Sequence, residues 1–177
     1  MKIIFTSLLL LLFCANAKSQ PNNKETGWLT LKDKSYSIKY PNNWEVDQSG
    51  QSGTSFILLS VLEVAEDLFR ENINLLVQDL TGKNIDLTKY TEISEGQIKT
   101  MMPHSKIIES ELIKNKAGDY HKIIYTGDQC NFHLKFEQYY WVIKNKAYVL
   151  TFTSEESKFA AYKEVADKIL NSFVIKK

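Results

Sequence analysis

The 177-residue chain has few of the residues from which compact chemical sites are built: 2 cysteines, 3 histidines and 7 glycines. The histidines at 104, 121 and 133 are scattered, and none stands in an HExxH motif or beside a cysteine pair, so no local zinc motif is present. No glycine-rich nucleotide loop follows a predicted strand, and GQSGT (50–54) has the wrong order for a GxSxG nucleophile elbow. A catalytic site or metal site would therefore have to be assembled by the tertiary fold, and we expect neither a cofactor nor a metal.

A long hydrophobic run is also lacking. Residues 1–17, MKIIFTSLLLLLFCANA, combine Lys2, a short apolar stretch and a small-x-small ending, which predicts a secretory signal peptide cleaved after Ala17. A membrane-spanning helix would need about 20 apolar residues. Lipid attachment at Cys14 is disfavoured because the bulky Phe13 precedes it. We expect a periplasmic or secreted protein that does not span a membrane.

Charge of one sign is absent as well. Lys2 is the only charged residue removed with the signal peptide, which leaves 21 basic and 21 acidic side chains. Without a global positive field, we expect no nucleic-acid partner. Cleavage would also remove Cys14, so Cys130 could form no intrachain disulfide, and we expect it to be a small buried hydrophobic residue.

Alternating and apolar segments dominate the remaining chain. Residues 18–26 are polar without periodicity and predict a flexible leader, and residues 27–177 predict a single domain. GWLTL (27–31) and YSIKY (36–40) predict a hairpin. Further strands are predicted at 54–61, 73–80, 106–113, 119–127, 132–143 and 147–154. The short connections KNKAG and KNK indicate two more hairpins.

Two amphipathic helices complete the pattern. Residues 86–102 place apolar side chains at roughly helical spacing behind Asp86, a plausible N-cap, and Pro103 ends the segment. From about 156 to 173, the apolar residues fall on one helical face. About six to seven strands joined mostly by hairpins predict an α+β fold, in which helices sandwich a largely antiparallel sheet.

The strand FHLKFEQYYWVI (132–143) carries the candidate binding residues. One face carries Phe132, Leu134, Phe136, Tyr140 and Val142 and predicts a core face, whereas the other changes from His133 at its start to Tyr139 and Trp141 near its end. If a helix covers that half, Tyr139 and Trp141 belong to the core; if not, they form an exposed aromatic patch suited to a partner or ligand. His133, Tyr139 and Trp141 are therefore the candidate residues for partner or ligand binding. A hydrolase using His133 or His121 is a remote alternative that requires a cleft.

The acidic connection EVAEDLFREN (63–72) could in principle supply oxygen ligands to a cation. Hard cations need six to eight oxygens in a shaped site, and here Arg70 stands among Glu63, Glu66, Asp67 and Glu71. We expect a solvated loop.

The stretch YPNNW (40–44) predicts a strand end, because Pro41 cannot donate a ladder hydrogen bond and the two asparagines suit a turn. Trp44 can then fold back onto the end of the sheet. We expect it to be structural.

This same stretch resembles a known family. The segments Tyr36 to Trp44, Asn72 to Val77, Asp86 to Leu87 and Asn171 to Phe173 together resemble PsbP-like domains, and the similarity covers about residues 28–175. The resemblance implies an antiparallel sheet between helices. Such domains include a photosystem II extrinsic subunit, a Ran-binding nuclear import factor and bacterial envelope proteins such as DcrB, and none is an ordinary enzyme. It implies docking without naming a partner, and no family functional residue can be carried over by position.

These observations predict an exported, non-enzymatic accessory, binding or assembly protein of the cell envelope. Its partner would be another envelope protein. The alternative is a carrier of a small apolar ligand or lipid, which would need a pocket between sheet and helix.

Overall fold

Two sheets and two α-helices form the fold in the computed structural model, which describes residues 27–64, 67–116 and 118–176. The predicted signal peptide and leader lie outside the described residues. The elements in chain order are β1 (Trp28–Lys32), β2 (Tyr36–Pro41), β3 (Glu45–Asp47), the 3-10 helix η1 (Gln51–Gly53), β4 (Thr54–Leu59), β5 (Asn72–Asp79), α1 (Leu87–Met101), β6 (Lys106–Ile113), β7 (Tyr120–Gln129), β8 (Phe132–Ile143), β9 (Lys146–Glu155), α2 (Phe159–Asn171) and β10 (Val174–Ile175).

The sheets are antiparallel throughout. Seven strands follow the order β3-β4-β5-β9-β8-β7-β6, and a smaller sheet has the order β1-β2-β10. All three predicted hairpins are present, because β1 pairs with β2, β6 with β7 and β8 with β9. The predicted α+β class is therefore confirmed, with the difference that the first hairpin belongs to a separate sheet that the last strand completes.

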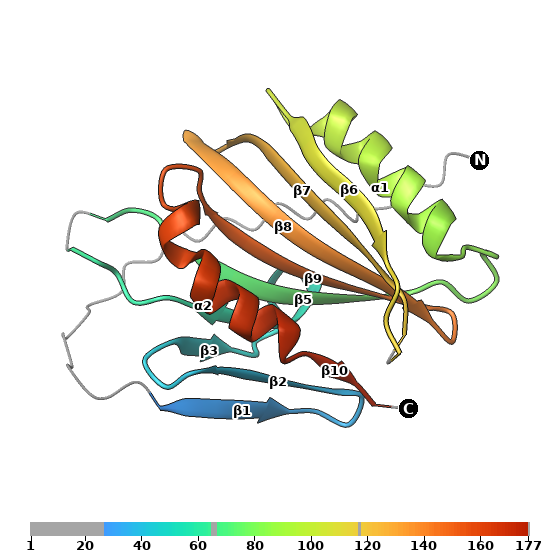
Figure 1. Ribbon diagram of the computed structural model, residues 1–177, viewed down its shortest axis with the longest axis horizontal. Coiled ribbons are helices and arrows are strands. Elements are labelled where there is room, and N and C mark those ends of the chain that lie inside the picture. Colours follow the sequence, from blue (N-terminus) through green and yellow to red (C-terminus); the bar gives the residue numbers. More distant parts are fainter. Residues whose placement is uncertain (1–26, 65–66, 117, 177) are drawn as a thin grey trace.

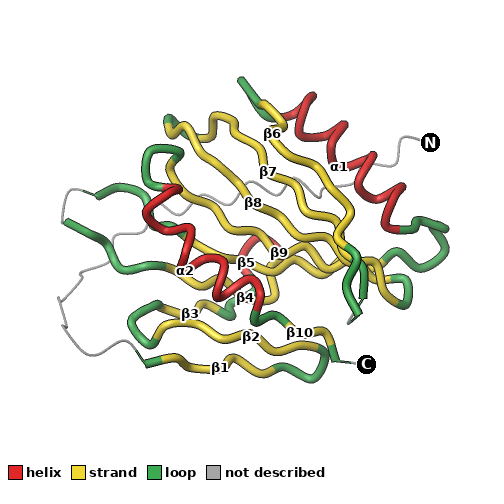
Figure 2. The backbone as a smooth tube through the Cα atoms, in the orientation of Figure 1, coloured by secondary structure: helices red, strands yellow, loops and turns green. Residues whose placement is uncertain are grey.

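The large sheet has a hydrophobic core on each face. Side chains alternate along a strand, so Tyr139 on β8 joins the core under α2 whereas Tyr140 joins the core under α1. The small sheet adds Tyr36 and Ile38 of β2 to the α2 side. Figures 1 and 2 show α2 beside the three-stranded sheet, with α1 over the β6 and β7 end of the large sheet.

The helix boundaries follow local signals. Asp86 is the N-cap of α1, and its Oδ1 accepts a hydrogen bond of 2.8 Å from the Lys89 amide. The helix ends at Met101, just before Pro103. Where it ends, Met102 packs on Gly127 of β7, a position at which any Cβ would overlap the methionine side chain. None of the described helices has the length and apolar character needed to cross a membrane.

Cys130 was predicted to be buried, and this prediction is wrong. The residue is exposed in the turn between β7 and β8, where its φ is 48°. Asn131 also has a positive φ, 72°, and a two-residue turn of this kind faces outward because it links two strand ends. The prediction relied on the hydrophobic character of cysteine and did not consider that Cys130 could lie in a turn.

Candidate ligand-binding pocket

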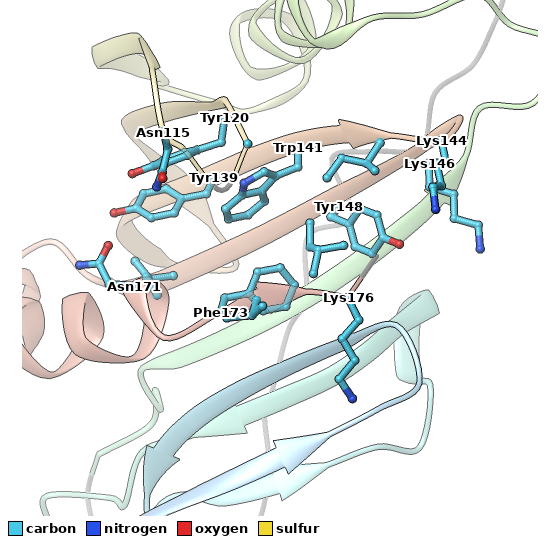
Figure 3. Close-up of a pocket in the computed structure, with 15 residues that line it drawn as sticks. Asn115, Tyr120, Tyr139, Trp141, Lys144, Lys146, Tyr148, Asn171, Phe173 and Lys176 are labelled. Carbon is cyan, nitrogen blue, oxygen red and sulfur yellow. The ribbon is translucent and has the colours of Figure 1, made fainter.

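A cavity of about 260 Å³ opens where four segments meet: the β6–β7 connection, the β8–β9 hairpin, the end of α2 and β10. Figure 3 shows the side chains that line it. The lining residues are Asn115, Gly118, Tyr120, Tyr139, Trp141, Ile143, Lys144, Lys146, Tyr148, Leu170, Asn171, Phe173, Val174, Ile175 and Lys176. The lining thus combines an aromatic and aliphatic interior with lysines and asparagines.

Aromatic rings in mutual contact form the wall. The ring of Tyr120 on β7 lies 4.9 Å from that of Tyr139 and 5.2 Å from that of Trp141, measured between centroids. The Trp141 ring is 5.4 Å from that of Phe173, which follows α2. Tyr148 is the cross-strand partner of Trp141 on β9. Such contacts fix the rings in place, because aromatic pairs at these separations attract beyond their area burial.

The end of α2 decides which of these rings is covered. Tyr139 is 5% exposed and belongs to the core, whereas Trp141 is only partly buried and Ile143 follows it on the same face. α2 stops at Asn171. Tyr139 is thus a core residue, and Trp141 is half-buried against the same core. Both line the cavity, and the pair does not form an exposed aromatic patch.

The rim is positively charged. Lys144 is the first residue of the turn between β8 and β9, and Lys146 follows the turn. The turn residues Lys144 and Asn145 have φ of 49° and 57°, as in a type I′ hairpin. Both lysines are exposed. Lys176 lines the cavity too, but its Nζ donates a hydrogen bond to the backbone carbonyl of Asp33. No acidic side chain is among the described residues that line the pocket.

The tyrosine hydroxyls at the other end remain neutral. Burial raises the pKa of Tyr139 well above its ordinary value, and the nearby Glu137 carboxylate adds to the effect. Tyr139 Oη donates to Glu137 Oε1 at 3.2 Å. Burial likewise raises the pKa of Tyr120. Tyr139 can therefore offer its ring to a ligand while its hydroxyl is engaged by Glu137, and neither tyrosine offers a phenolate.

His133 lies outside this pocket, near the opposite end of β8. Its Nδ1 is hydrogen-bonded to Asp128, and its Nε2 lies 2.9 Å from Glu156 Oε2. The bond to Asp128 raises the pKa of His133. The structure thus brings Tyr139 and Trp141 together and separates them from His133.

His121 is placed beside a serine, but not as a catalytic base. Its Nε2 lies 2.7 Å from Ser110 Oγ, and that hydroxyl donates to Glu95 Oε1 at 2.5 Å. Because the serine proton points to the carboxylate, Nε2 must donate to Oγ rather than accept its proton. A Ser-His-acid triad has the acid on the histidine instead.

Residues of the acidic connection form ion pairs within the protein. Lys158 Nζ lies 2.8 Å from Asp67 Oδ2 and 3.5 Å from Glu63 Oε2. Arg70 Nη1 lies 2.8 Å from Glu45 Oε2. Within the described residues, no group of three His, Cys, Asp or Glu side chains is placed to hold a metal ion.

The prediction of a solvated loop is wrong for the end of this segment. Phe69, Arg70 and Glu71 are buried, and Ser60 Oγ donates to Glu71 Oε2 at 3.4 Å. Burial raises the pKa of Glu71. The chain turns inward here to begin β5, whereas Glu63 is exposed to solvent. Glu66 is not among the described residues.

Comparison with known proteins agrees with this fold. The PsbP family model matches residues 29–175, and the chain belongs to the PsbP family. No curated protein sequence matches the chain.

Three solved structures show similar folds. Cyanobacterial PsbP (CyanoP) from Synechocystis sp. has a TM-score of 0.63 and 18% identity over 90% of this chain and 98% of its own. LpqN of Mycobacterium tuberculosis, involved in cell envelope biogenesis, has a TM-score of 0.65 and 14% identity over 87% and 93%. A Pseudomonas aeruginosa protein of unknown function has a TM-score of 0.60 and 10% identity over 85% and 98%. At such low sequence identities, these similarities show a shared fold and nothing further.

The sequence singled out two of the pocket residues. It missed Tyr120, Tyr148 and Phe173, which lie on three other segments. Alternation along β8 was the available signal for Tyr139 and Trp141. No comparable signal within one segment shows that β7, β9 and the end of α2 reach the same place.

Proposed function

We propose that this protein is an exported, non-catalytic binding protein of the cell envelope, and that it holds the apolar part of a small ligand in the aromatic pocket. The pocket itself carries the proposal: a concave site of about 260 Å³ with an aromatic wall and a few polar groups at its rim, which is the usual form of a small-molecule site. The signal-peptide pattern of residues 1–17 supports export. The likeness to LpqN, a protein involved in cell envelope biogenesis, supports the compartment.

The lining favours binding over turnover. Among the described residues around the cavity there is no histidine, cysteine, serine, aspartate or glutamate. General acid–base and nucleophilic chemistry most often depends on such groups placed against the substrate. Both histidines considered for a hydrolase, His121 and His133, lie elsewhere. The hydrolase alternative therefore has no support at this site.

The cavity size points to a small ligand. An apolar cavity of about 150 Å³ takes a benzene molecule, so the present volume accommodates on the order of ten carbon atoms by proportion. This favours a carrier of a small apolar group over an assembly protein that docks by a flat surface.

Native mass spectrometry of protein purified from the envelope fraction of its own organism tests the proposal. We expect a bound small molecule in the wild type. Val174→Trp should abolish it, because Val174 lines the cavity and is 55% exposed, so the larger side chain can enter the cavity without displacing the core. Val64→Trp is the matched control, since Val64 is 60% exposed and does not line the cavity.

A ligand-free mass for the wild type and for Val64→Trp would contradict binding in this pocket. Turnover of a substrate that Val174→Trp abolishes would contradict the non-catalytic role. A ligand retained by Val174→Trp would show that the molecule binds elsewhere.

A further inference from the structure

We propose that the ligand is a single-chain amphipathic anion, whose tail lies along Trp141 and Phe173 and whose carboxylate or phosphate is met by Lys144 and Lys146. This inference rests on the proposed function and adds the chemical class of the ligand. It follows from the distribution of charge around the pocket, from the order in which its residues lie and from its volume.

The charge at the pocket is local. The chain without residues 1–17 has equal numbers of basic and acidic side chains, yet the lining residues include three lysines and no acid. All three lysines are exposed, but the ammonium group of Lys176 donates a hydrogen bond to the Asp33 carbonyl, so the inference concerns Lys144 and Lys146. Neither of these two ammonium groups takes part in an ion pair with a described residue.

Two carboxylates near the rim make no direct contact with Lys144 or Lys146. Asp79 is opposite Lys146 in the β5–β9 register, and hydrogen bonds from Thr81, helped by the charge of Lys146, lower its pKa. Its Oδ1 accepts a hydrogen bond of 2.8 Å from the Thr81 amide, however, and no ion pair with Lys146 forms. Asp119 Oδ2, within the β6–β7 connection, lies 2.7 Å from Lys114 Nζ. An anion that enters the cavity therefore meets two lysines that no described carboxylate neutralises by direct contact.

The layout sets the direction of the ligand. Figure 3 shows Lys144 and Lys146 at one end of the cavity, Tyr120 and Tyr139 at the other, and Trp141 between them. A ligand with its charge at the lysine end must therefore run its apolar part across the Trp141 ring toward the tyrosines. The turn of positive-φ residues at 144 and 145 holds the lysines at the rim.

The volume limits the ligand to one chain. About ten carbons fill the cavity, which suits one medium-length acyl or alkyl chain and is too small for the two chains of a diacyl lipid. Carboxylate and phosphate heads share the required chemistry, because both are anionic acceptors for ammonium groups. A free fatty acid and a monoalkyl phosphate are thus distinguishable sources of the same interaction.

Isothermal titration calorimetry with four ten-carbon amphiphiles tests the inference: decanoate, decyl phosphate, decanol and decyltrimethylammonium. At low ionic strength, we expect the two anions to bind about tenfold more tightly than decanol, as two exposed charge contacts allow. The cation should bind most weakly. The ratio of decanoate affinity to decyl phosphate affinity indicates which head group the site prefers.

Two double variants distinguish the effect of the rim lysines from the effect of removing any two surface lysines. Lys144→Gln with Lys146→Gln should reduce anion affinity to the level of decanol and leave decanol unchanged. Lys89→Gln with Lys99→Gln removes two exposed lysines from α1, across the sheet, and should change neither affinity. All four positions are exposed, so neither double variant removes a core contact.

Equal affinities for anions and decanol, or a loss no greater in the rim variant than in the α1 variant, would overturn the inference while leaving the pocket function intact. Preferential binding of the cation would overturn it in the same way. Failure of all four amphiphiles, decanol included, would count against the proposed pocket function as well. Binding unaffected by Val174→Trp would place the amphiphiles outside the pocket and overturn the inference.

Discussion

Trp44 shows how one residue can serve the fold. It follows the turn after β2, where its amide donates to the Pro41 carbonyl at 3.0 Å, and its side chain is only 7% exposed. The indole belongs to the core on the α2 side of the sheet. The expectation that Trp44 is structural agrees with this burial.

Replacing Trp44 with alanine should therefore lower the free energy of unfolding by about 3 to 5 kcal/mol, because it removes a large buried ring and leaves a cavity. Urea unfolding followed by circular dichroism measures the change. Trp28→Ala is the control: Trp28 is 42% exposed, so its loss should cost about 1 kcal/mol or less. Equal losses in the two variants would contradict a structural role specific to Trp44.

His133 gives the fold a dependence on pH. Its hydrogen bond to Asp128 raises the pKa of His133, and the same bond lowers the pKa of Asp128. The folded state thus favours imidazolium and carboxylate together. The stabilisation from His133 is fully present below its unfolded pKa of about 6.5 and is lost as the pH rises through the higher folded pKa. The contribution of Asp128 is lost as the pH falls through its lowered pKa.

An NMR titration of the imidazole protons should place the pKa of His133 above that of His121, whose pKa is lowered by burial. Asp128→Asn should lower the pKa of His133 and leave that of His121 unchanged, since His121 is bonded to Ser110 instead. A pKa of His133 that does not respond to Asp128→Asn would contradict the assignment of its partner.

At the scale of elements, two of the four segments that carried the family resemblance, Tyr36 to Trp44 and Asn171 to Phe173, contact each other. Ser172, just past α2, accepts a hydrogen bond of 2.8 Å from the Lys39 amide of β2 and donates one of 2.6 Å to the Ile169 carbonyl. The Tyr36 and Phe173 rings lie 5.9 Å apart. The small sheet is therefore joined to α2 by the residues of these two short motifs, which explains their structural character.

Ser172→Ala should lower the free energy of unfolding by about 1 kcal/mol, the usual net value of one hydrogen bond. Hydrogen exchange at the Lys39 amide should become faster, because its acceptor is gone. Ser157→Ala, in the connection before α2, is a control that removes a serine hydroxyl outside this junction. An unchanged exchange rate at Lys39 would contradict the role of Ser172.

Most elements were predictable because their signals are local. The alternation in β2 and β8, the apolar run of β4 and the N-cap Asp86 of α1 each lie within one segment. Two strands were missed, β3 with 3 residues and β10 with 2, since so few residues cannot show a period. The second helix was predicted to start near residue 156, but α2 starts at Phe159. Residues before it form a turn, in which the Glu156 amide donates a hydrogen bond of 3.0 Å to the His133 carbonyl of β8.

At the scale of the whole molecule, β8 and β9 lie between the two cores and belong to both. Ile98 of α1 is buried in one core and Ile169 of α2 in the other, on opposite faces of the same strands. Loss of either core removes support from the strands that carry the other. We therefore infer that the two cores unfold together as one cooperative unit.

Ile98→Ala and Ile169→Ala should each lower the free energy of unfolding by about 2 to 5 kcal/mol. In both variants the transitions followed by far-ultraviolet circular dichroism and by tryptophan fluorescence should coincide. Two separated transitions in either variant would show that the cores unfold independently.

The sequence by itself determined the class of fold, the hairpins, both helices and the aromatic face of β8, because strand and helix periods are written in neighbouring residues. Only the tertiary structure decided that α2 ends before it covers the Trp141 side chain. It determined which residues surround the resulting cavity: Tyr120, Tyr148, Phe173 and the rim lysines. It also decided that Glu71 is buried and Cys130 exposed. The physical reason is that a pocket depends on the registers and lengths of several distant segments at once, and no single segment encodes where the others end.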